Sequence, residues 1–293
     1  MDSTTRLGMI GIGNMGHGIA STLVRKGHRL AFLEHPGNQP VDDLLAGGAE
    51  AAATVADLVA ASNVVILCIT GTPEVEAVLL GEGGVIANLR PRTVVIDHST
   101  AIPSSTQRLA ARVGAAGGRF LDAPMTGTPK DAAAGQINLL VGGDDGLFAE
   151  FEPLLADYAR KIVHAGPVGS GHALKLLHNF VSIGFAGVLS EAVACARLSG
   201  MDIGLYVDVL ASGGGRSTML DRLRPYIETG DTSQYRFSIA NASKDIGYYA
   251  ALAEELGAAR GVAEALRATL AAAVEGGHGQ ETLPEMTTVL GER

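Results

Sequence analysis

The sequence predicts an α/β domain followed by an all-α domain, the two joined by a long helix. Short apolar segments alternate with helical segments through the first half of the chain, which is typical of βαβ units and a mostly parallel sheet. This pattern stops near Gly166, and only helical periodicity continues after it. The chain has 293 residues, enough for two domains that each bury a core. We therefore expect one domain over residues 1–165 and a second over 166–293.

The elements of the first domain can be placed in order. Helices are expected over 15–26, 41–46, 74–80 and 104–117, with right-handed crossovers between parallel strands. The strands that alternate with them are LGMIGI, LAFLE, VVILCIT, TVVIDHST, RFLDAP, INLLVGG and KIVHAGP.

The second domain begins with a long apolar helix over 172–198, which Gly200 would end as a C-terminal cap. Further helices are expected over 205–211, 218–228, 238–256 and 261–275. The stretch ASGGGRSTML, residues 211–220, is either a substrate-selecting loop or a flexible connector.

Composition limits the classes of partner. The formal net charge of −9 disfavours nucleic acid and anionic membranes, which need clustered positive charge. Cys68 and Cys195 lie in apolar runs, so buried thiols in a reducing compartment are expected rather than a disulfide framework or a zinc site. No export signal and no membrane-spanning run is recognised, and we expect a cytoplasmic protein without a metal site.

The stretch GMIGIGNMGHGIA, residues 8–20, contains the spacing G-x-G-x-x-G. The first glycine allows a tight turn, the second lets the backbone approach a pyrophosphate, and the third lets helix and strand pack closely. The following helix N-terminus offers N–H groups to phosphates. The motif predicts a Rossmann dinucleotide-binding fold, with a cofactor loop made of Gly11, Ile12, Gly13, Asn14, Met15 and Gly16.

An acidic residue follows the next predicted strand. Glu34 lies roughly 20 residues after the last glycine, where a carboxylate bonds the ribose hydroxyls of NAD and repels the extra phosphate of NADP. NAD is therefore the expected cofactor, although the neighbouring His35 could contact a phosphate and NADP stays open.

Four further stretches extend the pattern over nearly the whole chain. They are DHST at 97–100, FLDAPMTGTPKDAAAGQINLLVGG at 120–143, GPVGSGHALKLLHNF at 166–180 and SKDIGYYAALAEELG at 243–257. In this order the sequence resembles the β-hydroxyacid dehydrogenase family, which includes 3-hydroxyisobutyrate dehydrogenase and tartronate semialdehyde reductase. The resemblance implies reversible NAD(P)-dependent oxidation of a small 3-hydroxy acid, in an active site between a Rossmann domain and a helical domain.

The resemblance also implies residue roles. Lys175 corresponds to the family's catalytic lysine and Asn179 to its companion asparagine. Thr100 corresponds to the residue beside the nicotinamide, and Lys244, followed by Asp245, to a lysine near the cofactor.

The substrate loop departs from the family pattern. Thr126, Gly127 and Thr128 stand where the family has a Ser-Gly-Gly loop for the substrate carboxylate. Pro129 restricts both itself and Thr128, so the loop should be stiffer. Carboxylate binding is expected to survive through the Thr126 hydroxyl and the backbone, as a small anion nest.

The residues themselves support the acid–base role. Lys175 and Asn179 are four positions apart on a predicted helix and share a face. A lysine on a largely apolar face is unusual, and burial disfavours its ammonium form, which suits an acid–base group. The alternative is a lysine that extends from the edge of a core helix to solvent.

Other functions stay open. An imine reductase of the same fold would carry another residue in place of Lys175, and a non-catalytic dinucleotide-binding module would bind cofactor without turnover. Candidate substrates are 3-hydroxyisobutyrate, glycerate or tartronate semialdehyde, threonate-like sugar acids and sulfonate analogues. The apolar helices of the second domain predict a homodimer or homotetramer.

Overall fold

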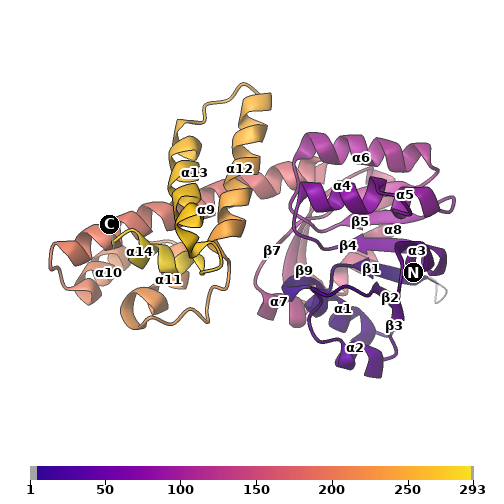
Figure 1. The fold of residues 1–293 in the computed structure, drawn as a ribbon, viewed down its shortest axis with the longest axis horizontal. Helices are drawn as coiled ribbons and strands as arrows, with labels where there is room; N and C mark the ends of the chain where they lie inside the picture. The colour runs from indigo at the N-terminus through magenta and orange to yellow at the C-terminus, as the bar shows by residue number, and fades with distance from the viewer. Residues whose placement is uncertain (1–4, 292–293) are drawn as a thin grey trace. The chain divides into compact units, whose positions relative to one another are not determined.

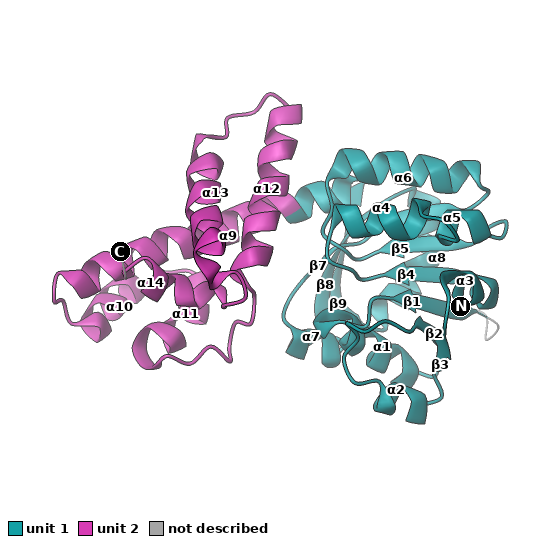
Figure 2. Cartoon of the chain, in the orientation of Figure 1, with its two compact units in different colours: residues 1–175 teal, residues 176–293 magenta. Residues whose placement is uncertain are grey.

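A computed structural model describes residues 5–291 of the chain. The chain divides into two compact units, Met1–Lys175 and Leu176–Arg293 (Figure 2). The division lies inside one continuous helix, α9 (Ser170–Leu198). The change of sequence pattern at Gly166 comes just before that helix.

The first unit is built on one twisted sheet (Figure 1). Its strand order is β3-β2-β1-β4-β5-β6-β8-β7, and β9 pairs with β8. The strands from β3 to β6 are parallel, as is β9 with β8, whereas β8 runs antiparallel to β6 and β7. The strands are β1 (Arg6–Ile10), β2 (Arg29–Leu33), β3 (Glu50–Ala52), β4 (Val64–Leu67), β5 (Val94–Asp97), β6 (Arg119–Asp122), β7 (Met125–Thr126), β8 (Ile137–Gly142) and β9 (Ala159–Gly166).

Helices cover both faces of this sheet, because successive strand side chains point to opposite faces. Val64 and Ile66 pack into one core cluster, and Val65 and Leu67 into the other. One face carries α1 (Asn14–Arg25), α2 (Asp42–Ala46), α7 (Pro129–Ala133) and α8 (Asp145–Ala156). The other carries α3 (Val55–Ala61), α4 (Thr72–Leu80), α5 (Val85–Asn88) and α6 (Pro103–Ala115).

The parallel sheet and its crossover helices confirm the predicted fold class. The sequence patterns did not predict α3, α5, α7, α8, β3 or β7. Pro153 lies inside α8, and a proline within a helical pattern normally indicates a helix end. The α3, α5 and α7 helices are too short to be stable alone and depend on packing against the sheet.

The second unit contains the remainder of α9 and a set of helices around its own core. The predicted helices are present, with ends shifted by a few residues. They are α10 (Ile203–Ser212), α11 (Thr218–Thr229), α12 (Ile239–Glu255) and α13 (Gly261–Ala273). The short helix α14 (Met286–Val289) and the short turns η1 (Val274–His278) and η2 (Leu283–Glu285) were not predicted. The glycine-rich stretch runs from the end of α10 to the first turn of α11, and Ser217 in it caps α11 by accepting a hydrogen bond from the Leu220 N–H.

The expectation about the two cysteines needs correction. Cys195 is exposed, so the expectation of two buried thiols is wrong for that residue. Cys68 is partly exposed as a residue, although burial of its thiol is enough to raise the thiol pKa. In a helix the side chains of an apolar run point in all directions, and position 195 faces outward. The α9 helix is also long and apolar enough to cross a membrane by length and composition alone, with 39% of the relevant window buried in the protein.

Candidate active site

The glycine loop joins β1 to α1 in the conformation that a phosphate-binding turn requires. Gly11 has φ +99°, and a Cβ there would overlap the carbonyl oxygen of Cys68. A Cβ on Gly16 would overlap the carbonyl oxygen of Gly11. Both positions therefore need glycine for the loop to close. Gly13 is different, because a Cβ there would meet nothing within 4 Å.

The N-terminus of α1 is suited to an anion. Gly13 is its N-cap, no side chain caps the helix, and its first turn holds no acidic residue. The backbone N–H groups and the positive end of the helix dipole are thus left for a ligand. The open space at Gly13 lies at the same place. The residues present fit the pyrophosphate of a dinucleotide.

Glu34 follows β2 on an exposed segment that is fastened to the glycine loop. The Asn38 side chain donates to the Leu33 carbonyl at 2.9 Å and accepts from the Ile12 N–H at 3.4 Å. The Gln39 N–H donates to the Ile12 carbonyl at 2.7 Å. The segment that carries the predicted ribose ligand is therefore fixed against the predicted phosphate loop.

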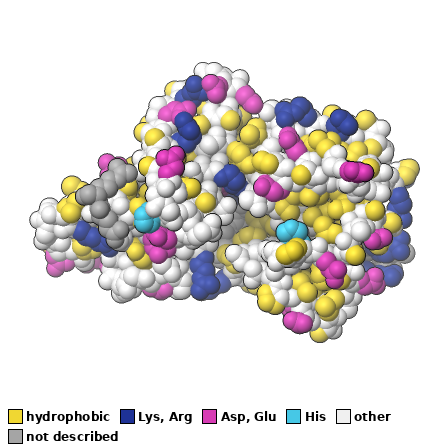
Figure 3. Space-filling model, in the orientation of Figure 1, with side chains coloured by type: hydrophobic (Ala, Val, Ile, Leu, Met, Phe, Trp, Pro, Cys, Tyr) yellow, Lys and Arg dark blue, Asp and Glu magenta, His cyan; other side chains and the backbone are white. Residues whose placement is uncertain are grey.

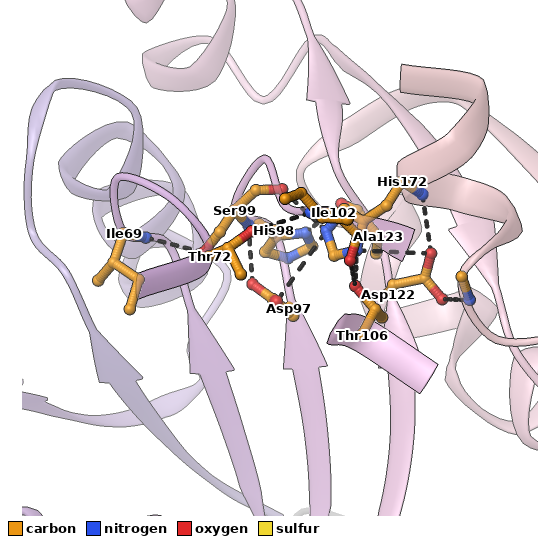
Figure 4. Close-up of polar contacts among 11 residues, drawn as sticks. Ile69, Thr72, Asp97, His98, Ser99, Ile102, Thr106, Asp122, Ala123 and His172 are labelled. Carbon is orange, nitrogen blue, oxygen red and sulfur yellow. Dashed lines mark hydrogen bonds and ion pairs between the residues drawn. The ribbon is translucent and has the colours of Figure 1, made fainter. Parts of the chain in front are cut away.

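Thr100 lies in the segment that follows β5, and this segment is tied at several points (Figure 4). The Ser99 N–H donates to Asp97 Oδ1 at 2.9 Å, and the Ile69 N–H donates to Ser99 Oγ at 3.1 Å. The second bond joins the loops after β4 and β5, two neighbouring strands whose carboxyl ends lie at the same edge of the sheet. Ligands of doubly wound sheets bind at this edge.

The first turn of α9 is anchored to the same edge by two buried side chains (Figure 4). Asp122, at the end of β6, accepts from the N–H groups of Gly169 at 2.7 Å and His172 at 2.8 Å. His172 Nε2 donates to the Ser99 carbonyl oxygen at 3.0 Å, and Nδ1 lies 2.8 Å from Thr106 Oγ1. Asp122 and His172 are both fully buried. A carboxylate at the N-terminus of a helix also complements the helix dipole.

Lys175 lies one turn further along α9 and is half-buried. Because His172 is bonded to Asp122 and Ser99, the placement of Lys175 relative to this edge of the sheet is fixed one turn away. Asn179 follows four residues later on the same helix and is buried. The shared helical face that the spacing predicted follows from the continuity of α9.

The buried groups behind this edge are held neutral. Burial lowers the pKa of His98 to about 4, with a further contribution from His172. His98 Nδ1 lies 2.6 Å from the Ala123 carbonyl and Nε2 lies 2.9 Å from the Tyr158 hydroxyl. Burial raises the pKa of Tyr158, and it raises the pKa of the Cys68 thiol to about 12. The pair His98 and Tyr158 thus joins the residue after β5 to the residue before β9 without a net charge.

Asp97 is a buried acid in the same region. Its side chain is fully buried, and among residues 5–291 its Oδ2 atom has no hydrogen-bond partner. Burial raises the pKa of Asp97, while the nearby His172, 4.0 Å from Oδ2, opposes that rise.

The substrate loop predicted at Thr126–Thr128 connects β7 to α7. Gly127 has φ +132°, where a side chain would be strained. Thr128 is the N-cap of α7: its N–H and hydroxyl both donate to Asp131 Oδ2, at 2.7 and 2.8 Å. The Thr128 donors are therefore engaged inside the loop. Thr126 and Gly127 are left as the candidates for substrate contact.

The second unit holds a buried amide–carboxylate pair. Asn179 Nδ2 donates to Asp245 Oδ2 at 2.6 Å, and the residues are 5% and 3% exposed. Lys244 Nζ lies 3.3 Å from Asp245 Oδ1 and 5.5 Å from the centre of the Tyr248 ring. Lys244 and Asp245 are thus not a solvated surface pair. The Asp245 carboxylate is buried and accepts a hydrogen bond from Asn179, the asparagine predicted as the companion of the catalytic lysine.

Sequence reasoning named Lys175, Asn179 and Lys244 but missed the buried acids that hold the site. Asp97 and Asp122 each end an apolar strand, in VVID and RFLD. An acid at the carboxyl end of a parallel strand is a signal that could have been read. Within residues 5–291, no group of three or more His, Cys, Asp or Glu side chains could hold a metal ion.

Two family models match the chain in sequence. Residues 6–166 match the NAD binding domain of 6-phosphogluconate dehydrogenase. Residues 169–290 match the NAD-binding domain of NADP-dependent 3-hydroxyisobutyrate dehydrogenase. The two matches together cover both compact units.

Named relatives are similar to this chain over most of its length. The NAD-dependent L-serine dehydrogenase of Pseudomonas aeruginosa is 31% identical over 89% of this chain and 86% of its own length. The 2-hydroxy-3-oxopropionate reductase of Escherichia coli is 33% identical over 74% of this chain and 73% of its own. A solved structure of Mycobacterium tuberculosis 3-hydroxyisobutyrate dehydrogenase with L-serine superposes with a TM-score of 0.85, at 26% identity, over 98% of this chain and 99% of the other.

An imine reductase from Myxococcus stipitatus also shares the fold. Its TM-score is 0.63 at 22% identity, over 97% of this chain and 99% of its own. That likeness concerns the fold alone.

Proposed function

The chain belongs to the β-hydroxyacid dehydrogenase family, and we propose that it transfers a hydride between a nicotinamide cofactor and a small 3-hydroxy acid or its semialdehyde. The observation that carries this proposal is the anchoring of Lys175: the preceding turn of α9 is bonded through His172 to the segment that bears Thr100. The cofactor, when bound, supplies the hydride acceptor for oxidation and the hydride donor for reduction.

Lys175 is the proposed acid–base group. Its amine takes the proton from the substrate hydroxyl oxygen as the hydride leaves the carbon that bears that hydroxyl. In the reverse direction its ammonium returns the proton to the oxygen. The ammonium also stabilises negative charge on the carbonyl oxygen during reduction. Asn179 is the proposed companion that orients the substrate hydroxyl, and Asp245 fixes its amide.

Thr126 and Gly127 are proposed to hold the substrate carboxylate through the hydroxyl and the backbone. Gly127 lies in a positive-φ conformation next to the capped start of α7. Such turns present N–H groups to anions. The resulting anchor would fix the distance between the carboxylate and the carbon that loses the hydride.

NAD is the proposed physiological cofactor. Glu34 directly follows β2, and the next residues His35, Pro36 and Gly37 include no arginine or lysine. A carboxylate there favours two ribose hydroxyls over a phosphate. Gly11–Gly16 is the proposed pyrophosphate site, and Thr100 and Lys244 are proposed to lie near the nicotinamide half.

The test is reduction of NAD and of NADP at alkaline pH with a panel of 3-hydroxy acids. The panel contains 3-hydroxyisobutyrate, glycerate, threonate, a sulfonate analogue and L-serine, the last because of the name of the P. aeruginosa relative. Lys175→Ala is compared with Lys161→Ala, which changes an exposed lysine elsewhere in the first unit. We expect turnover of at least one acid, lost by about a thousandfold in Lys175→Ala and kept in Lys161→Ala.

The other outcomes separate the alternatives. Reduction of a cyclic imine without turnover of any hydroxy acid would support an imine reductase. Tight NADH binding with no turnover of either class would support a non-catalytic module. An unchanged rate in Lys175→Ala would reject the acid–base assignment.

A homodimer or homotetramer in the cytoplasm is proposed as the working state. Leu177, Val181, Phe185 and Val188 form an exposed apolar stripe along α9, with exposures of 49, 56, 53 and 72%. Burying such a stripe against a second copy removes apolar surface from water. Light scattering of Phe185→Glu should show a smaller species than the wild type.

Nucleic acid and membranes are not the proposed partners. On the face drawn in Figure 3, acidic and basic side chains are interspersed, and the net charge of the chain is −9. Binding of the wild type to lipid vesicles would contradict the proposal that the protein works in the cytoplasm.

A further inference from the structure

Thr126 is paired across the sheet with a polar residue that fixes the role of its hydroxyl. Thr126 on β7 lies directly opposite Asn138 on β8 in the antiparallel register. The Asn138 Nδ2 donates to Thr126 Oγ1 at 3.0 Å. Cross-strand pairs of this kind are close enough for side-chain bonding. The threonine oxygen is therefore already used as an acceptor.

An irregularity in the sheet brings an arginine to the other end of the same amide. Ile137 pairs with Ala159, but Asn138 pairs with Lys161, so Arg160 is an extra residue on β9. Bulges of this kind change the direction of a side chain and are frequent beside active sites. The Arg160 Nε–H donates to Asn138 Oδ1 at 3.0 Å.

These bonds have only one consistent direction. A guanidinium has donors and no acceptor, so the amide oxygen of Asn138 must face Arg160. The amide nitrogen must then face Thr126 and donate to it. Since the Asn138 Nδ2 group is a donor, the Thr126 hydroxyl proton cannot point back at it. Within residues 5–291, the structure gives that proton no other acceptor.

We propose that Arg160 and Asn138 are positioning residues that keep the Thr126 hydroxyl a hydrogen-bond donor, and so select substrates with an anionic group at this point. The inference rests on the proposed function, in which Thr126 holds the substrate carboxylate. A carboxylate accepts hydrogen bonds and cannot donate them. A Thr126 hydroxyl whose proton points away from Asn138 can donate to a substrate carboxylate. A Thr126 hydroxyl that donates to Asn138 cannot.

The experiment measures binding of isobutyrate, which has the carboxylate but no hydroxyl, to the NADH-bound protein by calorimetry. It also measures KM and kcat for the best hydroxy acid of the panel. Arg160→Glu replaces the donor by an acceptor, so the Asn138 amide turns over and its oxygen faces Thr126. The Thr126 proton is then directed to Asn138. Asn138→Leu removes the amide without adding charge.

We expect Arg160→Glu to raise the dissociation constant of isobutyrate and the KM by about tenfold, with kcat within about twofold of wild type. Asn138→Leu should raise both severalfold. Arg160→Lys, which keeps a donor, should restore binding to within about twofold. Lys161→Glu makes the same change of charge on the neighbouring residue, which is exposed as Arg160 is, and should leave binding within about twofold.

Equal weakening by Arg160→Glu and Lys161→Glu would mean that only net charge matters and would overturn the inference. No weakening by Arg160→Glu or Asn138→Leu would overturn it as well. Thr126→Val separates it from the proposed function. If Thr126→Val weakens isobutyrate binding while the Arg160 and Asn138 variants do not, only the inference fails. If Thr126→Val has no effect, the carboxylate anchor itself fails, and the inference with it.

Discussion

His172 Nε2 donates a hydrogen bond of 3.0 Å to the backbone carbonyl oxygen of Ser99, inside the protein and out of contact with water. This bond joins the first turn of α9 to the loop after β5 (Figure 4). Residues on either side of it are the proposed acid–base group, Lys175, and the proposed neighbour of the nicotinamide, Thr100. The bond therefore couples two parts of the reaction site through a residue that need not touch the substrate.

His172→Leu should lower kcat by about tenfold, because small displacements of a catalytic group are costly. It should also destabilise the protein by about 1–3 kcal/mol, since the Ser99 carbonyl is left unpaired. His172→Gln can keep the donor and should recover most of kcat. Steady-state kinetics and urea unfolding of both variants check this. A Leu variant with wild-type kcat would contradict the positioning role.

The buried pair of Asn179 and Asp245 makes a second prediction. Asp245→Ala should cost about 1–3 kcal/mol in unfolding free energy, because the Asn179 amide loses its partner inside the protein. In Asp245→Asn the amide oxygen can still accept the hydrogen bond from Asn179, so most of the unfolding free energy should remain. We expect kcat to fall by about tenfold, because the negative charge beside Lys244 is lost. Asp208→Asn, at an exposed acid of the same unit, is the control and should change neither quantity.

Gly13→Ala distinguishes a phosphate loop from a structural turn. The added methyl group meets no protein atom within 4 Å and the backbone has φ −79°, so the melting temperature without cofactor should stay within about 2 °C of wild type. The methyl group would occupy the space of the pyrophosphate, and the dissociation constant of NADH should rise by about tenfold or more. Gly114→Ala, also open but on α6, should leave NADH binding unchanged. Unchanged affinity in Gly13→Ala would argue for a plain turn.

Glu34→Arg tests the cofactor preference. Replacing the carboxylate by a guanidinium removes the ribose ligand and provides a partner for the extra phosphate of NADP. The ratio of kcat/KM for NAD to that for NADP should fall by about tenfold or more. Glu50→Arg makes the same charge change on β3 and should alter the ratio little. If the wild type already prefers NADP, the assignment of Glu34 is wrong.

The pH dependence of stability should contain a contribution from His98. Burial lowers its pKa from 6.5 to about 4, so between these values the unfolded chain binds a proton that the folded chain does not. The contribution is absent above the unfolded pKa and destabilises the fold as the pH falls through 6.5 toward 4. Its full size is about 3 kcal/mol.

The check compares urea unfolding of wild type and His98→Gln at several pH values from 4 to 8. The difference between the two proteins isolates His98, because Asp97, whose pKa burial raises, contributes to both. The wild type should lose stability relative to the variant below about pH 6.5. Parallel pH curves for the two proteins would show that His98 does not titrate as the structure indicates.

Much of this protein follows from sequence patterns because the signals are local. The glycine loop, the apolar strands and the helices of the second unit each depend on residues close together in the chain. The same holds for the spacing of Lys175 and Asn179 on one helix. The outlines of α8 were not predicted, because Pro153 within it resembles a helix end until the packing of its apolar face is known.

The tertiary structure decided which polar side chains meet. Asp122 caps α9, Asp245 holds Asn179, and Arg160 reaches Asn138, and each of these contacts joins positions that are distant in the chain. A one-residue bulge in β9 brings Arg160 to Asn138, and strand propensity does not predict where such a bulge occurs. The sequence alone determined the fold class, the cofactor loop and the candidate lysine, since these depend on short-range patterns. Which buried partners orient those groups depended on long-range packing, and only the folded chain determines that.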